Sequence, residues 1–176
     1  GAYAVDSNVL KTEINEKNNP VFKLESLSRI NGFDSSDAHS ALFDAELTMK
    51  ILKLIKKNQP NTWDMFLRTA SRADTETIFQ KESIITLNEY FYGKSRLYLC
   101  APLHPKHCIH PVYKWGQAVD LRADIEPILN LSINELKLEM KKTPKFLRTI
   151  RSNKAPIILG PEYGMKVEPY NAMDQS

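Results

Sequence analysis

Cysteine and long apolar runs are scarce in this sequence of 176 residues. Its two cysteines, Cys100 and Cys108, are too few for a disulfide framework, and we expect a protein of the reducing cytoplasm. The longest apolar runs, such as residues 156–159, fall far short of the roughly 20 residues that cross a bilayer, so we expect no membrane association. The N-terminal residues lack the basic segment and apolar core of a secretory signal. Internal repeats and low-complexity tracts are also missing.

What is present is the composition of a soluble globular protein, with 42% hydrophobic and 26% charged residues. The net charge of +3 is uneven: residues 1–60 contain 8 Lys and Arg against 8 Asp and Glu, and residues 61–176 contain 16 against 13. Residues 137–154 hold seven basic residues and a single acid. Such a run is either an ordinary solvated face or a surface that follows nucleic-acid phosphates, where clustered cations gain from counterion release. The sequence leaves both interpretations open.

Helical patterns dominate the first 75 residues. Short helices are predicted over residues 22–32 and 62–72. A longer amphipathic helix is predicted over residues 37–57, with the serine or aspartate at 36–37 as its N-cap and Pro60 beyond its end. Its predicted buried stripe follows the i, i+3, i+4 spacing. The stripe consists of Ala38, Ala41, Leu42, Ala45, Met49, Leu52 and Ile55.

The rest of the chain has the β-branched and aromatic composition of strands. Residues 132–142 return to a helical pattern that opens with a capping box, Ser132 followed by Glu135. The predicted fold class is therefore α+β, with helices first and then a β-rich unit that contains one inserted helix. The predicted strand segments are residues 84–91, 96–103, 112–121 and the end of 146–159.

His39 and Asp44 are the first candidates for chemistry. Five residues correspond to about 140° on an ideal helix, so the two side chains converge only if His39 lies in the loop or first turn before the helix. A histidine there can act as a base, and a carboxylate in the first turns can hold a divalent metal. The plain alternative is that His39 belongs to the cap region and Asp44 is a solvated helix position.

A histidine- and cysteine-rich loop is the second candidate. Its donors lie within seven residues, which raises a zinc site as an alternative, although structural zinc sites draw their ligand pairs from separate elements. The interleaved prolines favour an exposed polar loop, which is our default interpretation. The donors are His104, His107, Cys108 and His110.

Aromatic residues recur through the β-rich segment, with Lys94, Arg96 and Lys114 between them. Alternating aromatics in strands more often form the core of a barrel than a binding surface. Some of them would, in the other interpretation, stack on single-stranded bases and contribute about 1–3 kcal/mol each. The aromatics are Tyr90, Phe91, Tyr92, Tyr98, Tyr113 and Trp115.

The segment HSALFDA at residues 39–45 resembles the third exonuclease motif of DEDDh-type 3′→5′ exonucleases. Residues 22–60 are similar to the end of the nuclease domain in the bacterial exodeoxyribonuclease I family. The resemblance implies the C-terminal helices of a ribonuclease H-like α/β nuclease domain over residues 1–60. It implies an SH3-like β-barrel domain with an inserted helix over residues 61–176. Within the second domain the similar segments are residues 101–103, 118–140 and 153–159.

The resemblance implies hydrolysis of phosphodiester bonds with two Mg²⁺ ions, with His39 as general base and Asp44 as a metal ligand. DEDDh enzymes use four acidic ligands, two of them in an Asp-x-Glu strand motif. The sequence Asp44-Ala45-Glu46 overlaps the third motif within a helix, so it cannot replace that strand motif. With three of four carboxylates missing, the chain is expected to be a middle fragment without activity of its own, because Mg²⁺ needs a fuller set of oxygen ligands.

The implied partner is single-stranded DNA, which the complete protein would degrade from its 3′ end in DNA repair. We predict DNA contacts from Lys141, Lys145 and Arg148, and a monomeric protein. The alternative is a binding module without catalysis, whose SH3-like unit contacts DNA or another protein. In this family such a contact could be the acidic tail of single-stranded DNA-binding protein.

Overall fold

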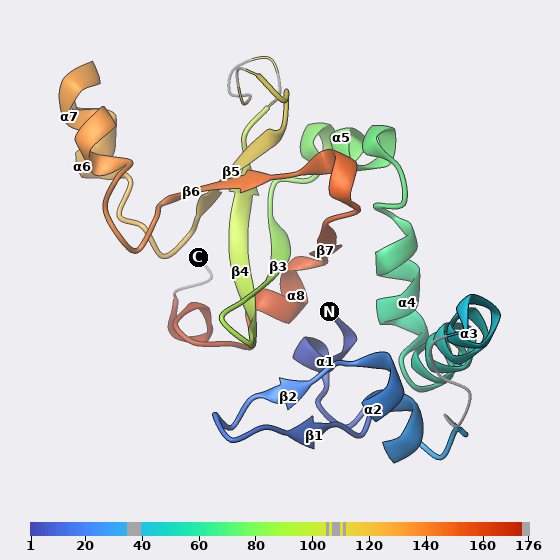
Figure 1. Ribbon diagram of the computed structural model, residues 1–176. Helices are drawn as coiled ribbons and strands as arrows, with labels where there is room; N and C mark the ends of the chain where they lie inside the picture. Colours follow the sequence, from blue (N-terminus) through green and yellow to red (C-terminus); the bar gives the residue numbers. More distant parts are fainter. Residues whose placement is uncertain (35–39, 105, 107–109, 111, 174–176) are drawn as a thin grey trace. The chain divides into compact units, whose positions relative to one another are not determined.

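The chain falls into two compact units, which we describe separately. The first unit comprises residues 1–64 and 89–96, and the second comprises residues 65–88 and 97–176. None of the helices in the described part of the chain has the length and apolar character needed to span a bilayer. The computed structural model describes all residues except 35–39, 105, 107–109, 111 and 174–176 (Figure 1).

The first unit is built from helices and one small antiparallel sheet (Figure 1). In the sheet Glu13 pairs with Val21, and α2 packs against both β1 and α3. The buried apolar residues are Ala2, Val9, Leu10, Leu27, Leu47 and Ile51. The elements are α1 (Ala2–Val5), β1 (Glu13–Ile14), β2 (Pro20–Val21), α2 (Leu24–Ile30) and α3 (Ala41–Asn58).

The long helix α3 ends where the sequence predicts and begins later. Its last residue is Asn58, and Pro60 follows at once. The N-cap is Ser40, whose hydroxyl accepts a hydrogen bond from the Phe43 amide at 3.3 Å. The predicted cap at residues 36–37 is therefore wrong, and those two residues lie outside the described part. A second serine closer to the apolar pattern provides the same cap chemistry.

Most of the predicted buried stripe of α3 is also wrong: residues 41, 42, 45 and 49 are exposed, residues 52 and 55 are half-buried, and Ala38 lies outside the described residues. Leu47 and Ile51, four residues apart, are the buried side chains of this helix, whereas Leu42 is 74% exposed and Met49 is 53% exposed. The helix carries two adjacent apolar stripes, and the spacing of residues identifies the helix without deciding which stripe meets a neighbour. The packing of α2 against α3 decides it.

Helix α4 (Pro60–Leu67) lies where a helix was predicted over residues 62–72, and a second helix, α5 (Arg72–Lys81), begins at the end of that region. Helix α4 begins at its proline, which suits the first helical turn. Helix α5 follows, and Ser71 and Asp74 form a reciprocal capping box at its start. The sequence analysis missed α5 because Asp74 takes the place that Glu or Gln holds in the usual motif.

The second unit contains a five-stranded antiparallel sheet in the order β6-β5-β4-β3-β7 (Figure 1). Strands β3 and β4 are joined by Tyr92 and Gly93, both with positive φ, which is the two-residue turn that matches the twist of a hairpin. The tip of this hairpin, residues 89–96, belongs to the first unit. The strands are β3 (Ile85–Phe91), β4 (Lys94–Pro102), β5 (Gly116–Asp120), β6 (Leu147–Ile150) and β7 (Ile157–Leu159).

Helices cover this sheet and complete the core of the second unit. Phe79 of α5 lies against Gly116, where any Cβ would collide with its ring. Thr86 on β3 donates to the Gly160 carbonyl at 2.8 Å and accepts from the Gly164 amide at 2.9 Å, which ties α8 to the sheet. The remaining elements are α6 (Glu126–Leu129), α7 (Ile133–Glu139), η1 (Ser152–Lys154), α8 (Pro161–Gly164) and η2 (Tyr170–Ala172).

The inserted helix α7 begins where the sequence predicts it and ends at Glu139, before the predicted end at residue 142, and a short helix that was not predicted, α6, precedes it. Ser132 caps α7, and its hydroxyl and amide both donate to the Glu135 carboxylate, at 2.6 and 2.8 Å. These hydrogen bonds lower the pKa of Glu135. The structure thus combines helices with an antiparallel sheet, as the predicted class requires. The boundary between residues 60 and 61 stays a prediction.

Candidate nucleic-acid interface

Asp44 lies in the first turn of α3, half-buried. It precedes Leu47 by three residues and Ile51 by seven, so it shares their side of the helix. Its amide donates to the Ser40 carbonyl at 2.9 Å, and its carbonyl accepts from the Thr48 hydroxyl at 2.8 Å. A carboxylate in the first turn is favoured by the helix dipole. His39 lies outside the described residues, so its convergence with Asp44 stays a prediction.

The described residues do not form a metal site. No group of three or more His, Cys, Asp or Glu side chains among them could hold a metal ion. The sequence contains two further Asp-x-Glu triplets, at residues 74–76 and 124–126, and both are on or at the start of helices rather than on strands. Asp44 alone therefore offers one oxygen ligand, whereas Mg²⁺ prefers six in octahedral geometry. The implied Mg²⁺ pair does not fit the described residues by themselves.

The histidine-rich loop is described only in part, since His107 and Cys108 lie outside the described residues. His104 is exposed, and His110 is half-buried. The Nδ1 atom of His110 accepts hydrogen bonds from the amides of Val112 and Tyr113, at 3.3 and 3.2 Å. This ring nitrogen therefore serves the fold of the loop.

The three predicted DNA contacts have different surroundings. Lys141 and Lys145 are exposed in the connection between α7 and β6. Arg148 lies on β6, and only 11% of its side chain is exposed. Its guanidinium lies 3.4 Å from the centre of the Tyr98 ring and donates to Asp120, through Nη2 at 3.1 Å and Nε at 3.2 Å. The lysines are available to a ligand, and the arginine is held within the protein.

Asp120 is the centre of a buried network that the sequence analysis missed. It is 1% exposed and accepts from Arg122 Nη2 at 2.6 Å and from the Tyr170 hydroxyl at 2.7 Å, in addition to Arg148. Burial acts to raise the pKa of Asp120, but the hydrogen bonds from Arg122 and Tyr170 outweigh it and lower that pKa. Burial, together with the Asp120 carboxylate, raises the pKa of Tyr170. A buried carboxylate with such partners is a structural anchor.

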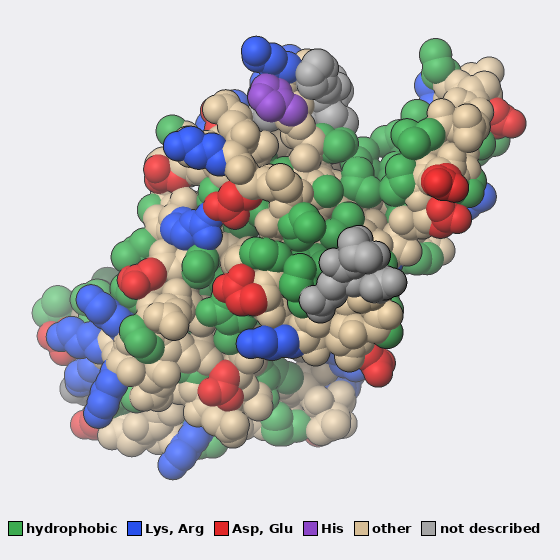
Figure 2. All heavy atoms as spheres, turned by 180° about the vertical axis from the view of Figure 1, so that it is seen from behind, with side chains coloured by type: hydrophobic (Ala, Val, Ile, Leu, Met, Phe, Trp, Pro, Cys, Tyr) green, Lys and Arg blue, Asp and Glu red, His purple; other side chains and the backbone are tan. Residues whose placement is uncertain are grey.

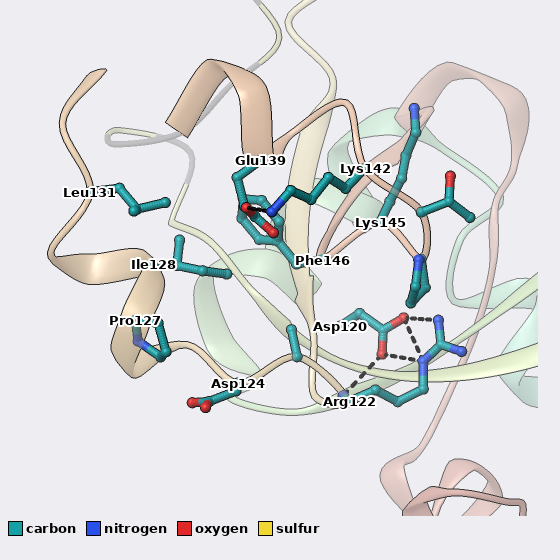
Figure 3. A pocket seen from close by; sticks show the side chains of 13 residues that line it. Asp120, Arg122, Asp124, Pro127, Ile128, Leu131, Glu139, Lys142, Lys145 and Phe146 are labelled. Atoms are coloured by element: carbon teal, nitrogen blue, oxygen red, sulfur yellow. Dashed lines mark hydrogen bonds and ion pairs between the residues drawn. The ribbon is translucent and has the colours of Figure 1, made fainter. Parts of the chain in front are cut away.

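A pocket of about 540 Å³ opens beside this network (Figure 3). Asp120 and Arg122 form one side, joined by the hydrogen bonds that Figure 3 draws. On the other side Lys142 is bound to Glu139 at 2.6 Å, and Lys145 is part of the lining. The apolar lining comes from Pro127, Ile128, Leu131, Pro144 and Phe146.

Hydrophobic side chains also gather outside the pocket, over α6 and α7 (Figure 2). Of the aromatics that the sequence singled out, some are buried and others are exposed. Tyr98 is buried in the sheet, as the core interpretation expects, whereas Tyr90, Tyr92 and Tyr113 are exposed. The exposed apolar residues of the α6–α7 region are Leu129, Ile133, Leu138 and Met140.

Solved structures with the same arrangement exist. Escherichia coli exonuclease I in complex with a dA16 oligonucleotide matches 97% of this chain, with a TM-score of 0.70 and 22% identity. An ExoI/SSB-Ct complex matches 99% of this chain, with a TM-score of 0.70 and 21% identity. A zinc-bound E. coli ExoI–ssDNA complex matches 97% of this chain, with a TM-score of 0.67 and 22% identity. The matches cover 38%, 39% and 38% of those chains. The chain therefore has the fold of one part of an exonuclease.

Sequence comparison finds relatives of the same kind as the solved structures. Exodeoxyribonuclease I of Buchnera aphidicola subsp. Acyrthosiphon pisum is 28% identical over 139 residues, 73% of this chain and 32% of the relative. The E. coli K12 enzyme is 27% identical over 141 residues, 77% of this chain and 29% of the relative. No protein-family model matches the chain. The chain is homologous to exodeoxyribonuclease I and spans about a third of the length of these relatives.

Proposed function

We propose that this chain is part of a 3′→5′ exonuclease that hydrolyses phosphodiester bonds at the 3′ end of single-stranded DNA. The observation that carries the proposal is the likeness to exodeoxyribonuclease I, over about three quarters of the sequence and nearly all of the fold. Solved structures of that relative contain single-stranded oligonucleotides. Because the chain spans about a third of its relatives, the activity belongs to the complete protein.

In this proposal residues 1–60 are the C-terminal part of a ribonuclease H-like nuclease domain, and residues 61–176 are an SH3-like domain. His39 is the general base that takes a proton from the attacking water, and Asp44 is a ligand of a divalent metal, Mg²⁺. The position of Asp44 at the start of α3 supports this role. The zinc-bound relative supports a metal-dependent reaction. The other carboxylates would come from outside this chain.

Phosphate contact is assigned to Lys141, Lys145 and Arg148, and the two lysines contribute more to binding than the arginine. The two lysines are exposed, so their charge is available to the DNA backbone. Arg148 shares its charge with Asp120 and is largely buried, so it contributes less to phosphate binding. The second unit thus holds the strand, and chemistry takes place in the nuclease domain.

Salt dependence of DNA binding tests the proposal. The affinity of the chain for a fluorescent single-stranded dT oligonucleotide is measured by anisotropy between about 50 and 200 mM salt. We expect a linear fall of log affinity with log salt, with a slope of about 0.7 for each phosphate contacted. Absence of binding at the lowest salt, or binding that ignores salt, would contradict DNA binding by this chain.

The ExoI/SSB-Ct likeness favours a second candidate function, the capture of an acidic protein tail. We infer that the acidic tail of single-stranded DNA-binding protein is a second partner of the complete protein. A peptide with that acidic sequence, titrated in the same anisotropy assay, separates the two functions. Binding of the peptide without binding of the oligonucleotide would favour a protein-binding module. We propose that the protein is a monomer, which size-exclusion chromatography with light scattering tests.

A further inference from the structure

The end of the connection between β4 and β5 forms a cluster of aromatic rings. Tyr113 stacks on Trp115, with ring centroids 4.3 Å apart and an angle of 16° between the planes. The imidazole of His110 contacts both rings, at 5.2 and 5.4 Å. The guanidinium of Arg151, from the neighbouring strand region, lies 5.3 Å from the Trp115 ring. An aromatic ring with a cation nearby is a surface on which single-strand binding proteins stack bases.

This cluster is held in place before any ligand arrives. The His110 amide donates to the Trp115 carbonyl, and the Lys114 amide donates to the His110 carbonyl, each at 2.9 Å. The indole Nε1 of Trp115 donates to Asn153 at 2.8 Å, which fastens the cluster to η1. Rings fixed in this way lose little conformational entropy when a ligand stacks on them.

One ring of the cluster is open to a ligand. Tyr113 is 57% exposed, whereas Trp115 lies between its neighbours, half-buried. The exposed part of the Tyr113 ring does not pack in a core, so it is available to stack on a ligand.

The two chain segments that meet beside the cluster carry charge of one sign. Residues 100–119 and 140–159 contain no Asp or Glu, and together they contain eight Lys and Arg. Strands β5 and β6, which belong to these two segments, pair with Gly116 opposite Ile150, so both segments meet directly below the cluster. Lys114 and Arg151 are the basic residues within the cluster or against it. The combination of an open aromatic face and cations fits a base and its phosphate.

We propose that Tyr113 is a base-stacking contact for single-stranded DNA, backed by Trp115, with Arg151 and Lys114 beside the adjoining phosphates. This inference rests on the proposed function and names one point on the path of the strand. Every base has a flat aromatic face, so the contact accepts any sequence. The contact adds affinity that salt affects little, unlike the phosphate contacts.

Two oligonucleotides of equal length separate stacking from phosphate binding. One carries thymine bases and the other is fully abasic, so both present the same phosphates. Affinities for both are measured with the 176-residue chain and with Tyr113→Leu, Tyr113→Phe and Tyr92→Leu. Tyr92 is the matched control because it is 90% exposed, carries the same ring and belongs to the first unit.

Tyr113→Leu should weaken binding of the base-bearing strand about 5- to 150-fold, which converts from ~1–3 kcal/mol per stacked base at 1.4 kcal/mol per tenfold. Its affinity for the abasic strand should not change. Tyr113→Phe should bind like the wild type, since it keeps the ring, and Tyr92→Leu should also bind like the wild type.

Three results would overturn the assignment. They are wild-type affinity of Tyr113→Leu for the base-bearing strand, an equal loss on the abasic strand, and an equal loss in Tyr92→Leu. In each of these cases the chain still binds DNA, and the proposed function stands. If the wild type binds neither strand at low salt, the proposed function fails and this inference fails with it.

Discussion

Replacing Arg148 should mainly lower the free energy of unfolding, whereas replacing the exposed Lys141 and Lys145 should mainly reduce the salt dependence of DNA binding. The comparison uses the double variant Lys141→Ala/Lys145→Ala and the single variant Arg148→Met, in which methionine keeps much of the side-chain volume. Each lysine that contacts a phosphate contributes about 0.7 to the log–log salt slope, so the double variant should lower the slope by about 1.4. Its free energy of unfolding should change by less than about 0.5 kcal/mol, because both side chains are exposed.

Arg148→Met removes two hydrogen bonds to Asp120, at 3.1 and 3.2 Å, and the contact with the Tyr98 ring at 3.4 Å. Breaking a buried pair costs about 3–5 kcal/mol when the remaining charge has no partner. Here Asp120 keeps Arg122, at 2.6 Å, and the Tyr170 hydroxyl. We therefore expect a loss of about 2–4 kcal/mol in the free energy of unfolding. The salt slope should fall by less than about 0.3.

Urea unfolding followed by circular dichroism measures the first quantity, and oligonucleotide anisotropy over a salt series measures the second. Lys53→Ala, an exposed lysine of α3, is the control that should change neither. If Arg148→Met lowers the slope by about 0.7 and leaves stability unchanged, its guanidinium reaches DNA and our account of the Asp120 network is wrong. If the double lysine variant keeps the wild-type slope, the basic run is an ordinary solvated face.

Two further predictions concern catalysis. The 176-residue chain should release no mononucleotides from 3′-labelled single-stranded DNA with Mg²⁺ or Mn²⁺, because no three or more His, Cys, Asp or Glu side chains of its described residues form a group that could hold a metal ion; release that His39→Ala abolishes would contradict this. In the complete protein, Asp44→Ala and His39→Ala should each lower turnover by about 10²–10⁴-fold and leave DNA affinity nearly unchanged. A variant that keeps more than about a tenth of wild-type turnover would show that its residue has another role.

Local signals in the sequence predicted the elements whose ends depend on neighbouring residues. Pro60 marks the end of α3, and Ser132 with Glu135 marks the start of α7, because a cap or a proline acts within one helical turn. Helix α5 has the same kind of signal in Ser71 and Asp74, and it was missed only because the acid is Asp instead of Glu. Strands β3, β4, β5 and β7 were likewise found from their β-branched and aromatic composition, whereas the short strands β1 and β2 were not predicted.

The candidate site was predictable only in part. The motif at residues 39–45 gave Asp44 a role, and the structure places it in the first turn of α3, while His39 stays a prediction. The basic run was visible in the sequence, but the sequence does not show that Lys145 is exposed and Arg148 is largely buried. Only the structure separates the exposed lysine from the arginine that Asp120 holds. The sequence placed Tyr113 and Trp115 among six candidate aromatics and did not predict that they stack on each other.

The sequence by itself determined where most of the helices and strands form and which segment is basic, because capping, proline and periodicity act between residues close in the chain. The tertiary structure alone decided that Leu47 and Ile51, and not Leu42, face the interior of the first unit. It also joined Asp120 to Arg148 and Tyr170, which are 28 and 50 residues away. Buried pairs of this kind depend on which surfaces come into contact when the chain folds, and the spacing of residues along the sequence does not predict those contacts.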